Sequence, residues 1–113
     1  HRNELFKDYE THLTTPRARL VGHSNTKDYF TSAWLLTIIV DKDRIALMKK
    51  LREHGIESGQ VHYRNDRYSV LGGRRSDLPH MDDVEDRYLV LPLHPRVRAE
   101  DVERICRLIN EGW

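Results

Sequence analysis

The feature that most constrains the fold is an apolar run from Thr31 to Val40, which reads Thr-Ser-Ala-Trp-Leu-Leu-Thr-Ile-Ile-Val. Bulky and β-branched side chains in a nearly continuous run are typical of a strand covered on both faces, although a buried helix has a similar pattern. The length of the run and the helix signal that follows it favour the strand. We therefore expect a central strand here, with Trp34 in the core.

Helices are expected where apolar residues recur every three or four positions. They cover residues 2–13, a second segment that Gly55 ends, and residues 99–111. Either Asp41 or Asp43 is expected to cap the second helix through its side-chain oxygen. The apolar faces of the second and third of these helices are expected to comprise Ile45, Leu47, Met48, Leu51, Val102, Ile105, Cys106 and Ile109.

Further strand signals lie near Leu20 and Val21, at Gln60–Tyr63 and at Tyr88–Leu91, and residues 82–86 have the pattern of a short helix. The chain has 113 residues, which suits one domain. Together these segments predict an α+β fold, in which a small and mostly antiparallel sheet of about three strands packs against helices.

Composition narrows the classes of partner. The formal net charge is only +1, so charge provides no argument for a nucleic-acid or membrane partner. The apolar run from Ala33 to Val40 is too short to cross a bilayer. Cys106 is the single cysteine, which rules out an internal disulfide and favours a reducing, cytoplasmic compartment.

The densest group of functional side chains is Val61-His62-Tyr63-Arg64-Asn65-Asp66-Arg67-Tyr68. Arginine binds phosphates and carboxylates through paired hydrogen bonds. Histidine, tyrosine and asparagine can hydrogen-bond to sugar hydroxyls. The alternative is a solvated surface loop with internal ion pairs.

In three stretches the sequence resembles the C-terminal domain of the DegT/DnrJ/StrS family of pyridoxal-phosphate (PLP)-dependent sugar aminotransferases. No single stretch is specific, but all three occur in order and cover nearly the whole chain. They are Ser32-Ala33-Trp34-Leu35-Leu36-Thr37-Ile38, the segment from Asp41 through Gly55-Ile56 to Val61-His62-Tyr63, and Tyr88-Leu89-Val90-Leu91-Pro92-Leu93-His94-Pro95 with Arg98-Ala99-Glu100-Asp101-Val102.

The resemblance implies the C-terminal small domain of a fold-type I PLP enzyme. Residues 1–113 would form this domain, with the helix at 2–13 linking it to a PLP-binding large domain outside the chain. Such enzymes work as homodimers and transfer an amino group, usually from glutamate, to a keto-sugar attached to a nucleotide. A few relatives use the same scaffold for sugar dehydration.

The resemblance also implies which residues contact the substrate. His62 and Tyr63 match the family's His-Tyr pair at the mouth of the active site, whereas Arg64, Asn65 and Arg67 replace the prolines and aliphatic residues of many members. We expect all five to bind substrate, with the last three setting a distinct sugar or nucleotide preference, and we expect no catalytic residue.

The family's Schiff-base lysine follows a strand in a Ser-x-x-Lys context. Lys7, Lys27, Lys42, Lys49 and Lys50 are the lysines of this chain, and none has that context. We therefore expect PLP to bind to the full-length protein and not to this fragment alone.

Two other interpretations also fit the sequence. A ferredoxin-like module that binds RNA or a small ligand without catalysis would fit the alternation of helices and strands, together with Arg64, Arg67, Arg74 and Arg75. The near-zero net charge and the lack of basic and aromatic residues along the strands weigh against RNA. A structural or dimerising domain is the other alternative.

Overall fold

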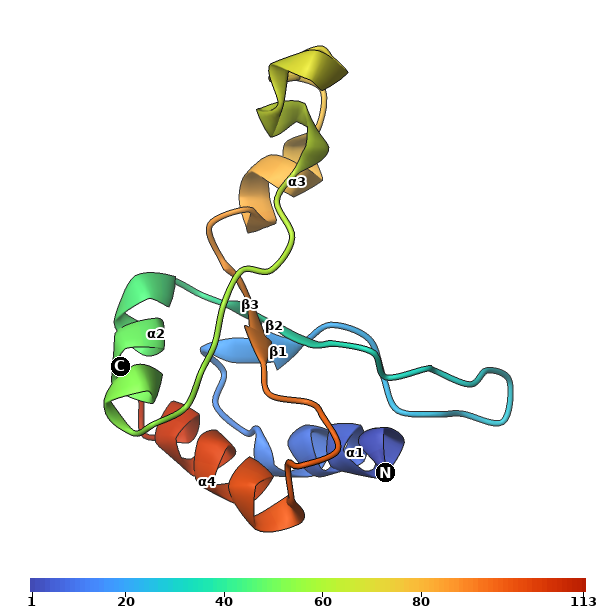
Figure 1. Cartoon of the computed structure of the whole chain (residues 1–113), viewed down its shortest axis with the longest axis vertical. Helices are drawn as coiled ribbons and strands as arrows, with labels where there is room; N and C mark the ends of the chain where they lie inside the picture. The colour runs from blue at the N-terminus through green and yellow to red at the C-terminus, as the bar shows by residue number, and fades with distance from the viewer.

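The computed structural model describes all of residues 1–113 and is built around a three-stranded antiparallel sheet (Figure 1). The strands are β1 (Ala18–Leu20), β2 (Leu36–Val40) and β3 (Tyr88–Leu91), and they lie in the order β1-β2-β3. In the register, Ala18 pairs with Val40 on one side of β2, and Ile38 pairs with Leu89 on the other. The α+β class and the small antiparallel sheet are confirmed.

The central strand β2 is the one that the apolar run predicts, but it is shorter. Leu36, Ile38 and Val40 are fully buried in it, whereas the expected segment from Thr31 to Leu35 lies outside the strand. The expectation that Trp34 is a core residue is wrong, because 63% of its surface is exposed. Hydrophobicity alone could not show that the chain leaves the sheet before Leu36.

Helices α1 (Arg2–His12) and α4 (Ala99–Asn110) pack against each other below the sheet in Figure 1, and α2 (Arg44–Glu53) also contacts α4. The buried Tyr9 hydroxyl of α1 donates to the Pro92 carbonyl, 2.9 Å away, just after β3. Asn110, at the end of α4, accepts the backbone N–H groups of Thr14 and Thr15, both at 3.0 Å. The first bond ties α1 to the segment after β3, and the other two tie the end of α4 to the segment between α1 and β1.

The start of α2 differs from the expectation. Asp43 is the N-cap residue but has a left-handed backbone (φ 55°) and makes no side-chain capping bond. The Asp41 carboxylate pairs instead with Arg17 (Nε–Oδ2 3.1 Å), so neither aspartate caps as predicted. Ile45, expected in the buried face, is 70% exposed. Gly55 follows the helix with φ 74°, which a residue with a Cβ adopts at a cost, and this confirms the predicted stop.

Two segments project from this body in Figure 1: the loop of residues 21–35, and a lobe that we define as residues 61–87. The lobe contains two short 3₁₀ turns, Asn65–Arg67 and Ser69–Leu71, and the helix α3 (Pro79–Val84), which begins earlier than the 82–86 segment expected.

The strand expected at Gln60–Tyr63 is absent, and a single bridge between Gly59 and Val90 takes its place. Pairing stops because the His62 N–H turns back to the Gln60 carbonyl, 2.6 Å away. The element order also differs from the β-α-β-β-α-β order of ferredoxin-like domains. None of the helices combines the length and the hydropathy needed to cross a bilayer.

Candidate functional site

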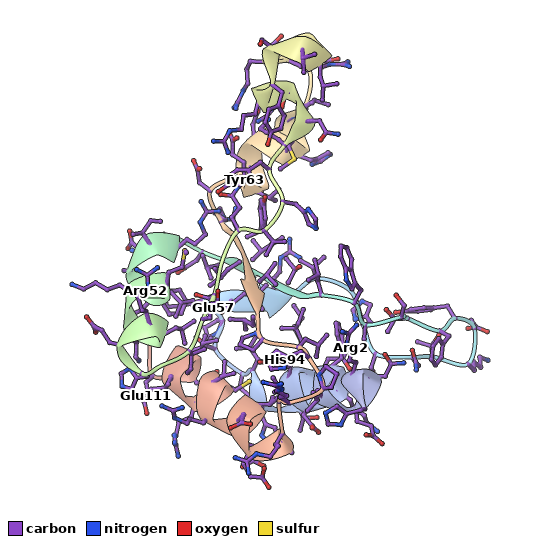
Figure 2. The ribbon with its side chains drawn as sticks, in the orientation of Figure 1. Arg2, Arg52, Glu57, Tyr63, His94 and Glu111 are labelled. Carbon is purple, nitrogen blue, oxygen red and sulfur yellow. The ribbon has the colours of Figure 1, made fainter.

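A cavity of about 450 Å³ opens at the base of the lobe. Gln60, Tyr63 and Arg67 form part of its lining, and Arg74, Glu85 and Asp86 form another part. Seven of its eight lining residues are polar or charged, so the cavity suits a polar ligand. We call it the lobe cavity. Figure 2 labels Tyr63, which lies where the lobe joins the body.

Tyr63 and Arg67 form a stacked pair in the wall of the lobe cavity. The guanidinium carbon of Arg67 lies 4.1 Å from the centroid of the Tyr63 ring, within cation–π range. Arg67 has no carboxylate partner, and its side chain makes no hydrogen bond within the chain. An exposed guanidinium that is held in position but unpaired can bind a phosphate or carboxylate through its paired N–H groups.

Arg64 lines the same cavity, but its guanidinium pairs with carboxylates of the chain. Its side chain is 4% exposed, and it donates from Nε and Nη2 to both carboxylate oxygens of Asp66. Its Nη1 lies 2.5 Å from an oxygen of Asp82 and 3.2 Å from one of Glu85. The guanidinium is therefore occupied by carboxylates of the chain itself.

The Asp66 carboxylate is the most buried partner of Arg64, the arginine at the centre of the lobe's ion-pair network. Besides Arg64, it accepts the backbone N–H of Arg75 at 2.9 Å. These hydrogen bonds hold the pKa of Asp66 well below its usual range, and the bond from Arg64 contributes most. Arg74 extends the network to Glu85 at 2.6 Å. The network ties the first 3₁₀ turn to α3, and no spacing in the sequence distinguishes its arginines from ligand-binding ones.

The remaining predicted residues lie apart from the stacked pair. Asn65 lines a separate hollow of about 370 Å³ with Leu71, Leu78 and Met81. The His62 ring faces Trp34, with ring centroids 5.7 Å apart, and does not line the lobe cavity. Of the five predicted residues, Tyr63, Arg64 and Arg67 thus line one cavity, and of these three only Tyr63 and Arg67 are free to bind a ligand there.

Sequence reasoning missed Gln60, which lines the lobe cavity. Its amide Nε2 donates to the Tyr88 hydroxyl at 3.0 Å, so β3 fixes its position. The one signal in the sequence is that it lies directly before the predicted Val61–Tyr68 group.

Comparison with known proteins identifies the family. Residues 1–110 match the family described as the DegT/DnrJ/EryC1/StrS aminotransferase family. The chain belongs to this family. Solved structures share the fold: AtS13 from Actinomadura melliaura is 32% identical with a TM-score of 0.85, and the sugar aminotransferase CalS13 from Micromonospora echinospora is 27% identical with a TM-score of 0.84.

Each of these alignments covers 99% of this chain but 30% of the other chain, so the chain spans about a third of its relatives' length. The fold is also shared with Spr1654 from Streptococcus pneumoniae in its PLP form, which is 23% identical over 97% of this chain and 30% of that one (TM-score 0.80). No protein with a curated functional description matches the sequence.

The residues of this aminotransferase-family chain do not fit PLP as a Schiff-base site. None of the five lysines lines the lobe cavity. Lys50 donates to the carbonyls of Leu108 and Gly112 at 2.6 and 2.7 Å, which uses it at the end of α4, and Lys49 lies 3.9 Å from Glu53. Lys7, Lys27 and Lys42 are exposed outside the lobe.

Proposed function

We propose that this chain is the C-terminal domain of a PLP-dependent aminotransferase that acts on a nucleotide-linked keto-sugar, and that it supplies substrate contacts and closes the active site. Membership of an aminotransferase family supports the reaction class. DesI, which shares the fold at 19% identity, has been solved with its TDP-sugar product. The observation that carries the proposal is the unpaired Arg67 guanidinium stacked on Tyr63 in the lobe cavity.

The two members of this pair have separate roles. Arg67 binds a phosphate of the nucleotide, because its cation has no partner inside the chain. The Tyr63 ring holds the guanidinium, while its hydroxyl, which makes no hydrogen bond within the chain, binds a sugar hydroxyl. Arg64 is assigned no direct contact with the substrate, because its guanidinium is paired with Asp66, Asp82 and Glu85.

The rest of the protein completes the enzyme in this proposal. PLP, held by a lysine of a large domain, supplies the electron sink for amino transfer. Glutamate is the proposed amino donor, and a cytoplasmic homodimer is the proposed working form. Asn65 lines a different hollow, so it influences the substrate only from outside the lobe cavity.

The test is amino transfer by the full-length protein, assayed with nucleotide-linked keto-sugars and glutamate. Arg67→Ala should lower kcat/KM about 10- to 100-fold through loss of a charge-assisted contact. The matched control is Arg52→Ala, which removes an exposed arginine of α2 outside the lobe (Figure 2). Equal effects of the two variants would remove Arg67 from the site.

Two further variants separate substrate contact from cofactor loading. His62→Ala and Tyr63→Phe should reduce turnover while the absorbance of bound PLP stays unchanged. Wild-type kinetics in both variants would show that neither side chain contacts the substrate. A full-length protein that transfers no amino group to any nucleotide-linked keto-sugar would overturn the proposed function as a whole.

A further inference from the structure

Trp34 and His62 form an exposed aromatic pair outside the lobe cavity. Trp34 lies just before β2 and His62 at the start of the lobe, yet their ring centroids are 5.7 Å apart with the planes tilted by 46°. Both side chains are exposed, and 63% of Trp34 is open to solvent. Two segments from distant parts of the sequence thus present a large aromatic surface that the chain itself leaves uncovered.

The backbone on both sides of this pair is held in an unfavourable conformation. Ala33 (φ 44°) and Val61 (φ 55°) each precede one of the two aromatic residues. A β-branched residue such as Val61 rarely has a positive φ. The His62 N–H donates to the Gln60 carbonyl, 2.6 Å away, so Gln60, Val61 and His62 form a strained γ-turn with Val61 at its centre. Strain of this kind persists where surrounding structure enforces it, and it concentrates at ligand sites.

We infer that Trp34 and His62 form a platform on which the base of a nucleotide stacks. The inference rests on the proposed function for the presence of a nucleotide. An indole ring offers a large, flat face, and any nucleobase can stack on it because every base has a π-face. The His62 ring nitrogens can exchange a hydrogen bond with the edge of the base. Since Tyr63 follows His62 directly, the platform borders the lobe cavity, where Arg67 binds phosphate.

The platform would give the exposed Trp34 a partner. The same loop carries Phe30, which is 77% exposed and is not paired with another aromatic ring. Phe30 is therefore a matched control, since it is another exposed aromatic side chain of residues 21–35 but lacks the paired ring and the strained neighbour.

The experiment is saturation-transfer NMR on the full-length protein with free nucleosides, which carry a base but no phosphate and no hexose. Transfer to the base protons is expected, and Trp34→Leu should weaken binding by about 5- to 150-fold, the loss that removal of one stacking ring produces. Trp34→Phe should retain most of the affinity and His62→Ala should lower it, whereas Phe30→Leu should leave it unchanged.

Three outcomes would overturn the inference: no transfer to any nucleoside, transfer that survives in Trp34→Leu, or transfer to a methyl glycoside but not to nucleosides. These failures are distinguishable from failure of the proposed function. An enzyme whose KM for the nucleotide-linked sugar is unchanged in Trp34→Leu contradicts the platform alone. A protein that binds nucleosides through Trp34 but transfers no amino group contradicts the proposed reaction alone.

Discussion

Arg64 and Asp66 form a bidentate ion pair across one turn of the lobe, with Nη2 2.6 Å from Oδ2 and both side chains at most 5% exposed. No residue of the lobe belongs to the hydrophobic cluster of the body. The order of the lobe therefore depends on this pair and on the carboxylates of α3 and its C-terminal end that share Arg64.

Asp66→Asn should open the lobe without unfolding the body. The substitution leaves the buried Arg64 charge without its main partner, and such a loss is strongly destabilising. Amide exchange at Arg75, whose N–H donates to Asp66, should accelerate at least about tenfold, while exchange in β2 stays slow. Asp77→Asn is the control, because its pair with Arg75 is exposed. Equal exchange in both variants would contradict the role of Asp66.

The lobe should also lose order in acid. Hydrogen bonds, from Arg64 to Asp66 and from Arg74 to Glu85, lower the pKa of both carboxyls in the folded state. A carboxyl group whose pKa is lowered in the folded state stabilises that state fully at pH values above its ordinary pKa. This stabilisation is lost as the pH falls from the ordinary pKa towards the lowered one. Exchange protection in the lobe, corrected for intrinsic rates, should be constant from about pH 5 to 7 and fall below about pH 4. A loss between about pH 5 and 7 would indicate a histidine instead.

Val61→Gly should stabilise the protein. Glycine adopts φ 55° without the clash of a branched Cβ, which offsets its larger entropy loss and gives a net gain of about 0.5–1 kcal/mol. Denaturant unfolding measures the change. Val70→Gly is the control, since Val70 is exposed without a positive φ and glycine there should destabilise. A destabilised Val61→Gly would mean that the turn at Val61 carries no strain.

Cys106 should react with thiol reagents only when the whole body unfolds. It is 1% exposed on α4, and burial raises its pKa to about 12, so the reactive thiolate is scarce. Labelling of the native protein should be at least about 10³-fold slower than in denaturant, in line with ordinary domain stability. Fast labelling would show that α4 opens locally.

Much of the body could be predicted from the sequence, because its elements follow local patterns. The nearly continuous apolar run that ends at Val40 is typical of a covered strand, and α4 repeats apolar residues at helical spacing. Asp43 shows where local rules fail: it stands at the position of a cap, but the turn from β2 sets its backbone, and no side-chain bond forms.

The same distinction applies to the candidate site. The chemistry of residues 61–68 made them candidates for binding and left a solvated loop as the alternative, and the adjacent His62 and Tyr63 carry part of the resemblance to the family. Whether an arginine faces a ligand or a carboxylate depends on residues far along the chain. Arg64 meets Asp82 and Glu85 because α3 folds back over it, whereas Arg67 meets only the ring of Tyr63.

The sequence therefore determined the fold class and the family, and it pointed to residues 61–68 as the candidate site, since all of these depend on short-range pattern. Only the tertiary structure decided that Arg64 supports the lobe, that Arg67 is free, and that Trp34 leaves the core to stand beside His62. These three features depend on whether segments far apart in the sequence come into contact. Such contacts exist only in the folded chain, so a local sequence pattern cannot predict them.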